Sequence, residues 1–295
     1  MEQAEQLKKK IDSAKDLRSV VKTMKALAAV NIRSLEKAAN SLDDYVEIIE
    51  MGLHIAMRSG KAQISAREHG HRHRTGIVVF GAGRGMSGRF NAKITDFLIE
   101  RIDKMNIIPG DRAIITIGDR IRPRLEREGL MIDKVFPIAD TIDEIPPLVD
   151  ELIIEIESWR ADRNFDRILL FNNRPKSGAS FHPEMNFLMP LNLQWLSELR
   201  HKHWDSRSLP TFTMEWEDLF AGLIRQYFFS ACYRAFAESL AAENAARLAS
   251  MQAAEKNIEE LLDDLNSKYN HQRQSQITSE LLDIVSGFET ISEDE

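Results

Sequence analysis

A glycine-rich segment is the part of the sequence best suited to binding a nucleotide. Residues 81–88 read GAGRGMSG, and Gly83 to Gly88 match the pattern G-x-G-x-x-G between a predicted strand and a predicted helix. In dinucleotide-binding proteins such glycines let the backbone approach a pyrophosphate at a helix N-terminus. An acidic residue should then follow about twenty positions later, at the end of the second strand. Asp103 falls inside a predicted helix and Asp119 comes too late. A glycine-rich turn is therefore favoured over a dinucleotide site.

Two histidine clusters have spacings that suggest metal binding. His69, His71 and His73 alternate along the chain, so one face of an extended segment would carry all three. Neighbouring arginines repel cations, and no cysteine or acidic ligand continues the pattern, so we expect a solvated loop. The same holds for His201 and His203. The sequence also contains no catalytic triad pattern, zinc-protease motif or P-loop. We predict no catalytic residue, no cofactor and no metal site.

Composition and charge exclude several other classes of protein. The 295 residues are 43% hydrophobic and 29% charged, with a net charge of -7, which gives no support to nucleic-acid binding. No segment reaches the roughly 18 uncharged apolar residues of a membrane span, so direct membrane insertion is not expected. The N-terminus lacks the apolar run of a signal peptide. The single cysteine, Cys232, lies in an apolar run and is expected to be a buried small hydrophobe.

The two ends of the chain predict long helices. All nine prolines lie between Pro109 and Pro210, and residues 223–286 contain neither proline nor glycine. A helix of that length would extend about 96 Å. At the N-terminal end, eight apolar residues recur at intervals of seven, which predicts a coiled-coil helix. They are Leu7, Ala14, Val21, Ala28, Leu35, Leu42, Ile49 and Ala56.

A second apolar line accompanies the first, and the C-terminal helix has a similar one. Arg18 and Lys25 interrupt the N-terminal companion line, and we expect Leu17 and Met24 to fill these gaps. The predicted C-terminal seam contains Met251, Ala254, Ile258, Leu261 and Leu265, followed by Ile277, Leu281, Ile284 and Phe288. An alanine-rich stretch before it, residues 241–249, suggests a close helix approach.

The middle of the chain has the pattern of an α/β domain. Short β-rich runs at 76–80, 113–118, 133–138 and 167–172 alternate with helical segments, which predicts a mostly parallel sheet. The segment around residues 178–191 adds a possible antiparallel edge strand.

These parts predict an α/β fold in which a Rossmann-like α/β domain is inserted into a long antiparallel coiled coil of the N- and C-terminal helices. The expected domains are a helix at 1–58, a globular foot at 75–210 and a helix at 215–290. Opposite charges favour pairing of the ends: residues 1–40 hold nine Lys/Arg and five Asp/Glu, whereas residues 255–295 hold three and eleven. The longer C-terminal helix should extend past the start of the chain.

The sequence resembles the gamma subunits of F-type ATP synthases over essentially its whole length. VVKTMKALAA in the first helix is similar to the family's ITKAMKMVAA, and the run AFAESLAAENAARLASMQAAEKNIEELL is closer still. GRGMSGRFN resembles the family signature D-R-G-L-C-G-x-x-N, which accounts for the glycines without a nucleotide. Gly83 replaces the signature aspartate, and Met86 and Ser87 replace Leu-Cys. These departures suggest a divergent branch, or one from an alternative complex.

The resemblance implies a non-catalytic rotor shaft that couples ion flow through a membrane rotor ring to ATP synthesis or hydrolysis. Its partners would be the alpha and beta subunits of the hexamer, an epsilon-type subunit and the ring, at the cytoplasmic face of the membrane as a peripheral component. The family's subunit contacts correspond here to Met24, Arg273, Gln274, Thr278 and Glu280, with Glu215 near the ring.

Several alternatives remain open at this point. Arg273 could instead pair with Glu280 or Asp283 of its own helix. The chain could be a Rossmann-like dinucleotide-binding enzyme with helical arms, or a coiled-coil tether protein. Dinucleotide binding would favour the enzyme, and co-purification with alpha and beta subunits would favour the shaft.

Overall fold

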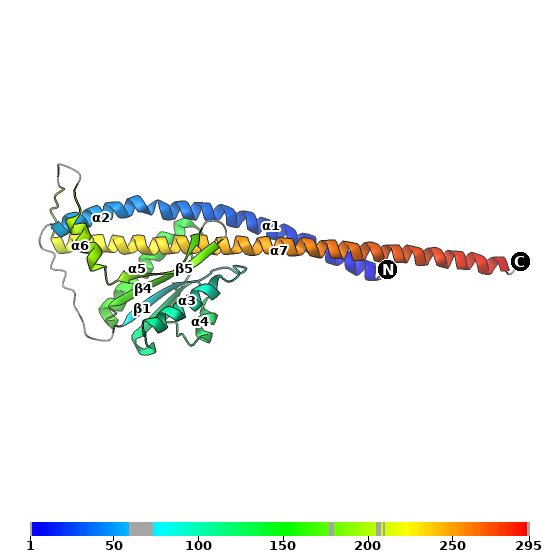
Figure 1. The fold of residues 1–295 in the computed structure, drawn as a ribbon, viewed down its shortest axis with the longest axis horizontal. Helices are drawn as coiled ribbons and strands as arrows, with labels where there is room; N and C mark the ends of the chain where they lie inside the picture. Colours follow the sequence, from blue (N-terminus) through cyan, green and yellow to red (C-terminus); the bar gives the residue numbers. More distant parts are fainter. Residues whose placement is uncertain (1, 59–72, 177–179, 205–207, 209, 294–295) are drawn as a thin grey trace. The chain divides into compact units, whose positions relative to one another are not determined.

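The chain has an α/β fold with long terminal helices, seen in a computed structural model that describes residues 2–58, 73–176, 180–204, 208 and 210–293 (Figure 1). Side chains are not described for residues 2–4, 283 and 286–293. The chain divides into two compact units, Met1–Ala28 with Leu248–Glu295 and Ala29–Arg247. Helices α1 (Glu2–Asn40) and α7 (Trp216–Glu293) contribute residues to both units.

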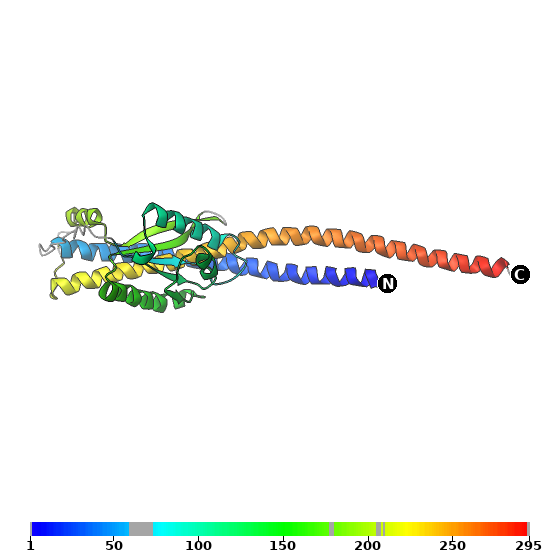
Figure 2. The same cartoon turned by 90° about the horizontal axis from the view of Figure 1, so that it is seen from below.

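In the first unit, the beginning of α1 packs as an antiparallel pair with the part of α7 between Met251 and Tyr269 (Figure 2). Arg18 of α1 contacts Glu259 of α7, whereas Lys25, farther along α1, contacts Glu255, which comes earlier in α7. The two helices therefore run in opposite directions, as predicted. Their buried apolar cluster contains Ile11, Ala14, Val21, Met251, Ile258, Leu262 and Leu265.

The predicted seven-residue repeat of the N-terminal segment marks buried positions. Seven of its eight residues are buried, from Ala14 to Ala56, and Leu7 is partly buried. The companion line differs from the prediction, because Leu17 is 53% exposed and does not fill the gap beside Arg18. Met24 is partly buried, as predicted. Arg18 and Lys25 are tolerated at the edge of the helix pair because their long side chains reach carboxylates on α7.

Between Met251 and Leu265, the seam of α7 departs from the prediction at one residue. Leu261 is 48% exposed, and the adjacent Leu262 is buried instead. Both leucines lie three or four residues from Ile258 and from Leu265, so either satisfies helical spacing. The position of α1 decides which of the two is covered.

Helix α7 continues past the part that α1 covers. The apolar cluster of the pair reaches as far as Leu7 on α1 and Tyr269 on α7. Among the described side chains beyond Tyr269, five large apolar ones of α7 are between 46% and 60% exposed: Ile277, Leu281, Leu282, Ile284 and Val285. Three of them, Ile277, Leu281 and Ile284, belong to the predicted seam, which α1 therefore does not cover here, and the Phe288 side chain lies outside the described residues.

In the second unit, α1 is followed by α2 (Leu42–Arg58), with a one-residue interruption at Ser41 where we predicted an unbroken helix. The Ser41 hydroxyl donates to the Ala38 carbonyl at 2.8 Å, a local bond that competes with regular helix geometry. The Ser41 amide still donates to the Lys37 carbonyl at 3.0 Å. The chain direction is therefore nearly preserved. Helix α2 runs antiparallel to the beginning of α7, since Asp43 pairs with Arg234 and the Ala56 carbonyl accepts from the Trp216 indole.

The described residues of the second unit form a five-stranded sheet with the order β3-β2-β1-β4-β5. Strands β1 to β4 are parallel, and β5 pairs antiparallel with β4, which confirms the predicted parallel sheet and its antiparallel edge strand. The strands are β1 (Thr75–Phe80), β2 (Arg112–Ile117), β3 (Lys134–Phe136), β4 (Arg167–Lys176) and β5 (Ser180–Met189).

Helices cover both faces of this sheet (Figure 1). Helices α3 (Phe90–Lys104) and α4 (Arg122–Arg127) pack on the face that carries Ile77 and Val79. Helices α5 (Ile145–Arg163) and α7 pack on the opposite face, with Val78 and Phe80. The remaining elements are α6 (Leu193–His201) and the short helices η1 (Pro109–Asp111) and η2 (Ile142–Glu144).

Within the described part of the chain, no helix is apolar over enough residues to cross a bilayer.

Candidate functional site

The glycine-rich turn joins β1 to α3 at the carboxyl end of the parallel strands. This is the edge where α/β sheets bind ligands. Two glycines of the turn lie too close to neighbouring side chains to carry a Cβ. A Cβ on Gly83 would lie 2.0 Å from Ile138 Cγ2, and one on Gly81 would lie 2.5 Å from Ile121 Cβ. Their contribution here is close packing within the protein.

The backbone donors of this turn already bind an anion, the carboxylate of Glu243 on α7. The Gly83 and Arg84 amides donate to its Oε2 and Oε1, each at 3.2 Å. Glu243 is only 3% exposed, so this carboxylate is held inside the protein. The amide groups that would face a pyrophosphate in a dinucleotide-binding protein are therefore used by the chain itself.

Arg247 balances the charge of this buried carboxylate. Its Nη2 donates to Glu243 Oε1 one helical turn away, and its Nη1 donates to Asn244 Oδ1 at 3.2 Å. The turn is fixed further by Asn91, whose Oδ1 accepts from the Ala82 amide at 2.8 Å. Buried charges in proteins are normally paired and hydrogen-bonded in this way.

Small residues of α7 allow the turn to approach the helix. Ala242 and Ala246 pack with Ala82 and Phe90, the residues that flank the turn. We predicted that the alanine-rich stretch allows two helices to approach each other. At these two positions it admits a strand-to-helix turn instead.

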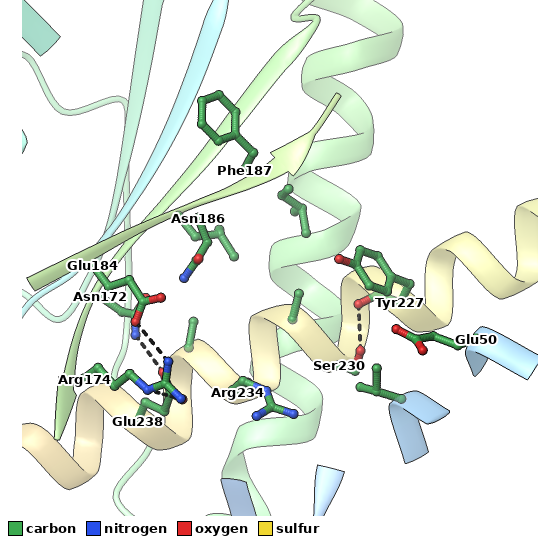
Figure 3. A pocket seen from close by; sticks show the side chains of 15 residues that line it. Glu50, Asn172, Arg174, Glu184, Asn186, Phe187, Tyr227, Ser230, Arg234 and Glu238 are labelled. Carbon is green, nitrogen blue, oxygen red and sulfur yellow. Dashed lines mark hydrogen bonds and ion pairs between the residues drawn. The ribbon is translucent and has the colours of Figure 1, made fainter. Parts of the chain in front are cut away.

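A second buried carboxylate, Glu238, lies five residues earlier on α7 and faces β4 (Figure 3). Its Oε2 accepts from Asn172 Nδ2 at 3.2 Å, and Arg174 lies 3.4 Å from its Oε1 and 3.5 Å from Glu184. Burial is the main reason that the pKa of Glu238 is raised, and Glu184 raises it further, whereas Arg174 and Arg234 lower it. These groups line a polar cavity of about 380 Å³ between α7, β4, β5 and α2.

The predicted subunit-contact residues are accessible on the first unit. Arg273, Gln274, Thr278 and Glu280 are exposed on α7, and Met24 is partly buried in the helix pair. The Thr278 hydroxyl donates to the Gln274 carbonyl at 2.9 Å, and Glu280 accepts from Gln276 at 3.0 Å.

Arg273 and Glu215, two of the predicted contact residues, lie in different units of the chain. Among the described residues, Arg273 forms no ion pair or hydrogen bond, and the Asp283 side chain is not among them. Glu215 belongs to the second unit, where it is exposed directly before α7, and its carbonyl accepts from the Leu219 amide at 3.1 Å.

Of the candidate metal ligands and the cysteine, His73 and Cys232 have defined surroundings in the described part of the chain. His69 and His71 lie outside the described residues, and His73 pairs with Asp166 at 2.6 Å. In the part of the chain that the structure describes, no group of three or more His, Cys, Asp or Glu side chains could hold a metal ion. Cys232 is fully buried, and burial raises the pKa of its thiol to about 12.

Glu243, Arg247 and Glu238 were missed by reasoning from the sequence. A signal was present, because Glu238, Glu243 and Arg247 are charged residues within an otherwise small and apolar run, AFAESLAAENAARLA. Charged side chains in such surroundings are rarely buried without a partner. Nothing local identifies the partner, because Gly83 lies 160 residues earlier.

Comparisons with known proteins identify the family. A family model described as ATP synthase matches residues 3–291. The chain is 28% identical over 294 residues to the ATP synthase gamma chain of Anaeromyxobacter sp., covering 97% of this chain and 98% of that protein. It is 25% identical over 296 residues to the ATP synthase gamma chain of Lachnoclostridium phytofermentans, with the same coverage.

Solved structures share the fold. A chain of the Euglena gracilis mitochondrial ATP synthase, in a structure of OSCP, F1 and the c-ring, superposes with a TM-score of 0.64 at 17% identity, covering 98% of this chain and 94% of that one. A chain of the rotor of the same synthase gives 0.62 at 16% identity, with 93% and 99% covered. Matched by the family model and by two gamma chains over nearly its whole length, the chain belongs to the ATP synthase family, among its gamma chains.

Proposed function

We propose that this gamma chain is the central rotor shaft of an F-type ATP synthase. It couples ion flow through a membrane ring to ATP synthesis or hydrolysis in a hexamer of alpha and beta subunits. The proposed shaft consists of residues 1–58 and 215–290, and residues 75–210 are the globular foot. Helix α7 contributes residues to both units and is continuous from Trp216 to Glu293, so it can transmit torque along its length.

The observation that carries this proposal is the end of α7 that α1 leaves uncovered. Five large apolar side chains beyond Tyr269 are about half exposed, and they recur along more than two turns of helix, from Ile277 to Val285. Exposed apolar side chains in such a series mark a surface that a partner covers. In the proposed complex, the alpha/beta hexamer would cover these side chains while the helix turns inside it.

The proposed polar contacts lie on the same segment. Arg273 is an exposed cation with no partner among the described residues, so its guanidinium is available to a carboxylate of a catalytic subunit. Gln274, Thr278 and Glu280 add hydrogen-bonding groups close by, and Met24 provides an apolar contact on α1. Glu215, in the second unit, would contact the ring.

We assign no catalytic role to the chain. The glycine-rich turn, its best candidate for nucleotide binding, has its amides bonded to Glu243, and an anionic nucleotide would have to displace a buried carboxylate. The remaining proposed partners are an epsilon-type subunit and the membrane ring. The chain would act at the cytoplasmic face of the membrane as a peripheral part of the complex.

Affinity purification of the full-length chain from its own cells tests this proposal. The expected result is a complex that contains alpha and beta subunits and hydrolyses ATP. Recovery of the folded chain without them would contradict the rotor role and would favour a separate tether protein.

A further inference from the structure

The glycine-rich turn and Glu243 are chemically complementary. Successive backbone amides that point the same way form a concave site for an anion. Here the Gly83 and Arg84 amides each donate to a different oxygen of the same carboxylate, and Arg247 of α7 donates to one of those oxygens as well. Such charge-assisted bonds are directional and stronger than bonds between neutral groups.

The two surfaces are also complementary in shape. Gly83 has no room for a side chain because Ile138 lies against it, so the turn packs closely on the segment that follows β3. On α7, Ala242 and Ala246 leave space for Ala82 and Phe90. Larger residues on either surface would separate the amides from the carboxylate by more than the length of a hydrogen bond.

This contact differs in kind from the apolar packing between α7 and the sheet, and it shares its directional character with the hydrogen bond and ion pair that join Glu238 to β4. The other contacts of α7 with this face include a broad apolar cluster around Phe236, Ala237 and Leu240. Apolar burial resists separation but is non-directional, so it opposes rotation of a helix about its own axis only through side-chain interlocking. The bonds to Glu243 have fixed directions, so together with those of Glu238 they fix the rotational setting of α7 against the sheet, and Glu243 supplies the contact to the turn after β1.

We propose that the glycine-rich turn is a receptor for the Glu243 carboxylate, and that this joint transmits torque between the α/β sheet and α7. The proposal rests on the rotor function proposed above and adds a positioning role for Glu243. When the ring turns the foot, the joint makes α7 turn with it. Without the joint, part of each rotation of the foot is lost as slippage or twist, and ATP hydrolysis becomes less tightly coupled to ion transport.

The test uses the intact complex in closed vesicles and compares Glu243→Ala and Glu243→Gln with the parent. The measured quantity is the ion gradient formed per ATP hydrolysed. Glu243→Ala should lower this ratio several-fold while ATP hydrolysis continues. Glu243→Gln keeps an oxygen acceptor, so its ratio should lie between those of the parent and Glu243→Ala. Glu100→Ala is the matched control, because Glu100 also pairs with a cation four residues later but is exposed on α3. It should behave as the parent does.

Hydrogen exchange of the purified chain supplies a readout of the contact itself. The Gly83 and Arg84 amides should exchange faster in Glu243→Ala than in the parent or in Glu100→Ala, while β1 and β4 keep their protection. Glu243→Ala complexes that assemble and transport ions at the parental ratio would overturn the proposal. If Glu243→Ala does not assemble, the decision passes to Glu243→Gln, for which parental transport and parental exchange would overturn it. Failure of the parental chain to join alpha and beta subunits would refute the rotor function instead, and the exchange experiment would still test the receptor.

Discussion

Arg18 donates a hydrogen bond to Glu259 at 2.7 Å, across the interface between α1 and α7. A second pair, Lys25 with Glu255, lies farther along α1 and also joins a basic residue of α1 to a glutamate of α7. Both basic residues occupy positions where the apolar line of α1 is interrupted. Charged pairs at a few positions of a coiled coil can select one register among several that the apolar residues would allow. We infer that these two pairs fix the register of the antiparallel helices.

Reversing these charges tests the register. Arg18→Glu with Lys25→Glu should lower the thermal stability of the helix pair, because like charges then face each other. Adding Glu259→Arg and Glu255→Lys should restore it. An exposed pair such as Arg18–Glu259 contributes about 0.2–1 kcal/mol, so the effect should be small and should weaken at high salt. Circular dichroism melts at two salt concentrations measure it. Equal melting of the double and quadruple variants would show that the pairs do not select the register.

Gly83 and Gly85 of the glycine-rich turn differ in the space that a side chain would have. Gly83→Ala should destabilise the second unit by about 1–3 kcal/mol, the usual cost of overpacking, because its Cβ would meet Ile138. Gly85→Ala is the control, since no atom lies within 4 Å of a Cβ at that position. The free energy of unfolding, measured with urea and tryptophan fluorescence, should fall in Gly83→Ala and stay at the parental value in Gly85→Ala. Equal values for the two variants would contradict the packing role of Gly83.

The same turn also distinguishes packing from nucleotide binding. We expect calorimetry to detect no binding of NAD to the parental chain. Micromolar NAD binding that Gly85→Asp abolishes would contradict the packing role and favour a dinucleotide-binding enzyme.

Glu238 should make the stability of the second unit depend on pH. Its folded pKa is raised, mainly by burial, so the folded state holds this proton more tightly than the unfolded state does. Its stabilising contribution is therefore fully present below the unfolded pKa of about 4.3 and is lost as the pH rises through the folded pKa. Glu238→Gln should be more stable than the parent at neutral pH, and this advantage should disappear towards acid pH.

Urea unfolding of both proteins at several pH values measures this difference. The groups that face Glu238 remain in the variant: Arg174 and Asn172 of β4, Glu184 of β5 and Arg234 of α7. A stability difference that does not change with pH would show that Glu238 is not the group responsible.

Arg273 should affect turnover more than assembly. A hydrogen bond to a charged group contributes about 1.5–3 kcal/mol, and a contact that forms at some rotor angles only would change their relative populations. Arg273→Ala should therefore give a complex with normal subunit ratios and an altered ATPase rate, and adding Gln274→Ala should enlarge the change. Lys256→Ala is the control, because Lys256 is an exposed cation of α7 that pairs with Glu260. Parental turnover in the double variant would remove these residues from the contact surface.

The helices and the sheet could be predicted because each has its own periodicity. Residues such as Ala28 and Ile49 repeat at seven, and the four parallel strands are short apolar runs between helical segments. Finer choices were beyond the sequence. Leu261 and Leu262 satisfy the same spacing, and only the position of α1 determines that Leu262 is the buried one.

The joint at Glu243 could not be predicted for a related reason. The glycine pattern indicated a close approach of the backbone to another group. The alanine-rich stretch indicated a close approach of the C-terminal helix to another element. The sequence does not show that these two segments contact each other. Only the fold shows this, because α7 lies beside the turn that follows β1. The proposed contacts of Arg273 depend on other chains and remain predictions.

Observation of rotation tests the central claim most directly. Gly110 is exposed and has open space around it, so Gly110→Cys provides an attachment point for a probe on the second unit. The one natural cysteine, Cys232, is fully buried with its thiol pKa raised to about 12, so it should not react with the label. With the alpha/beta hexamer fixed to a surface, ATP should drive the probe in continuous rotation in one direction. A probe that stays still or only fluctuates, while the same complexes hydrolyse ATP, would contradict the assignment of this chain as the rotor shaft.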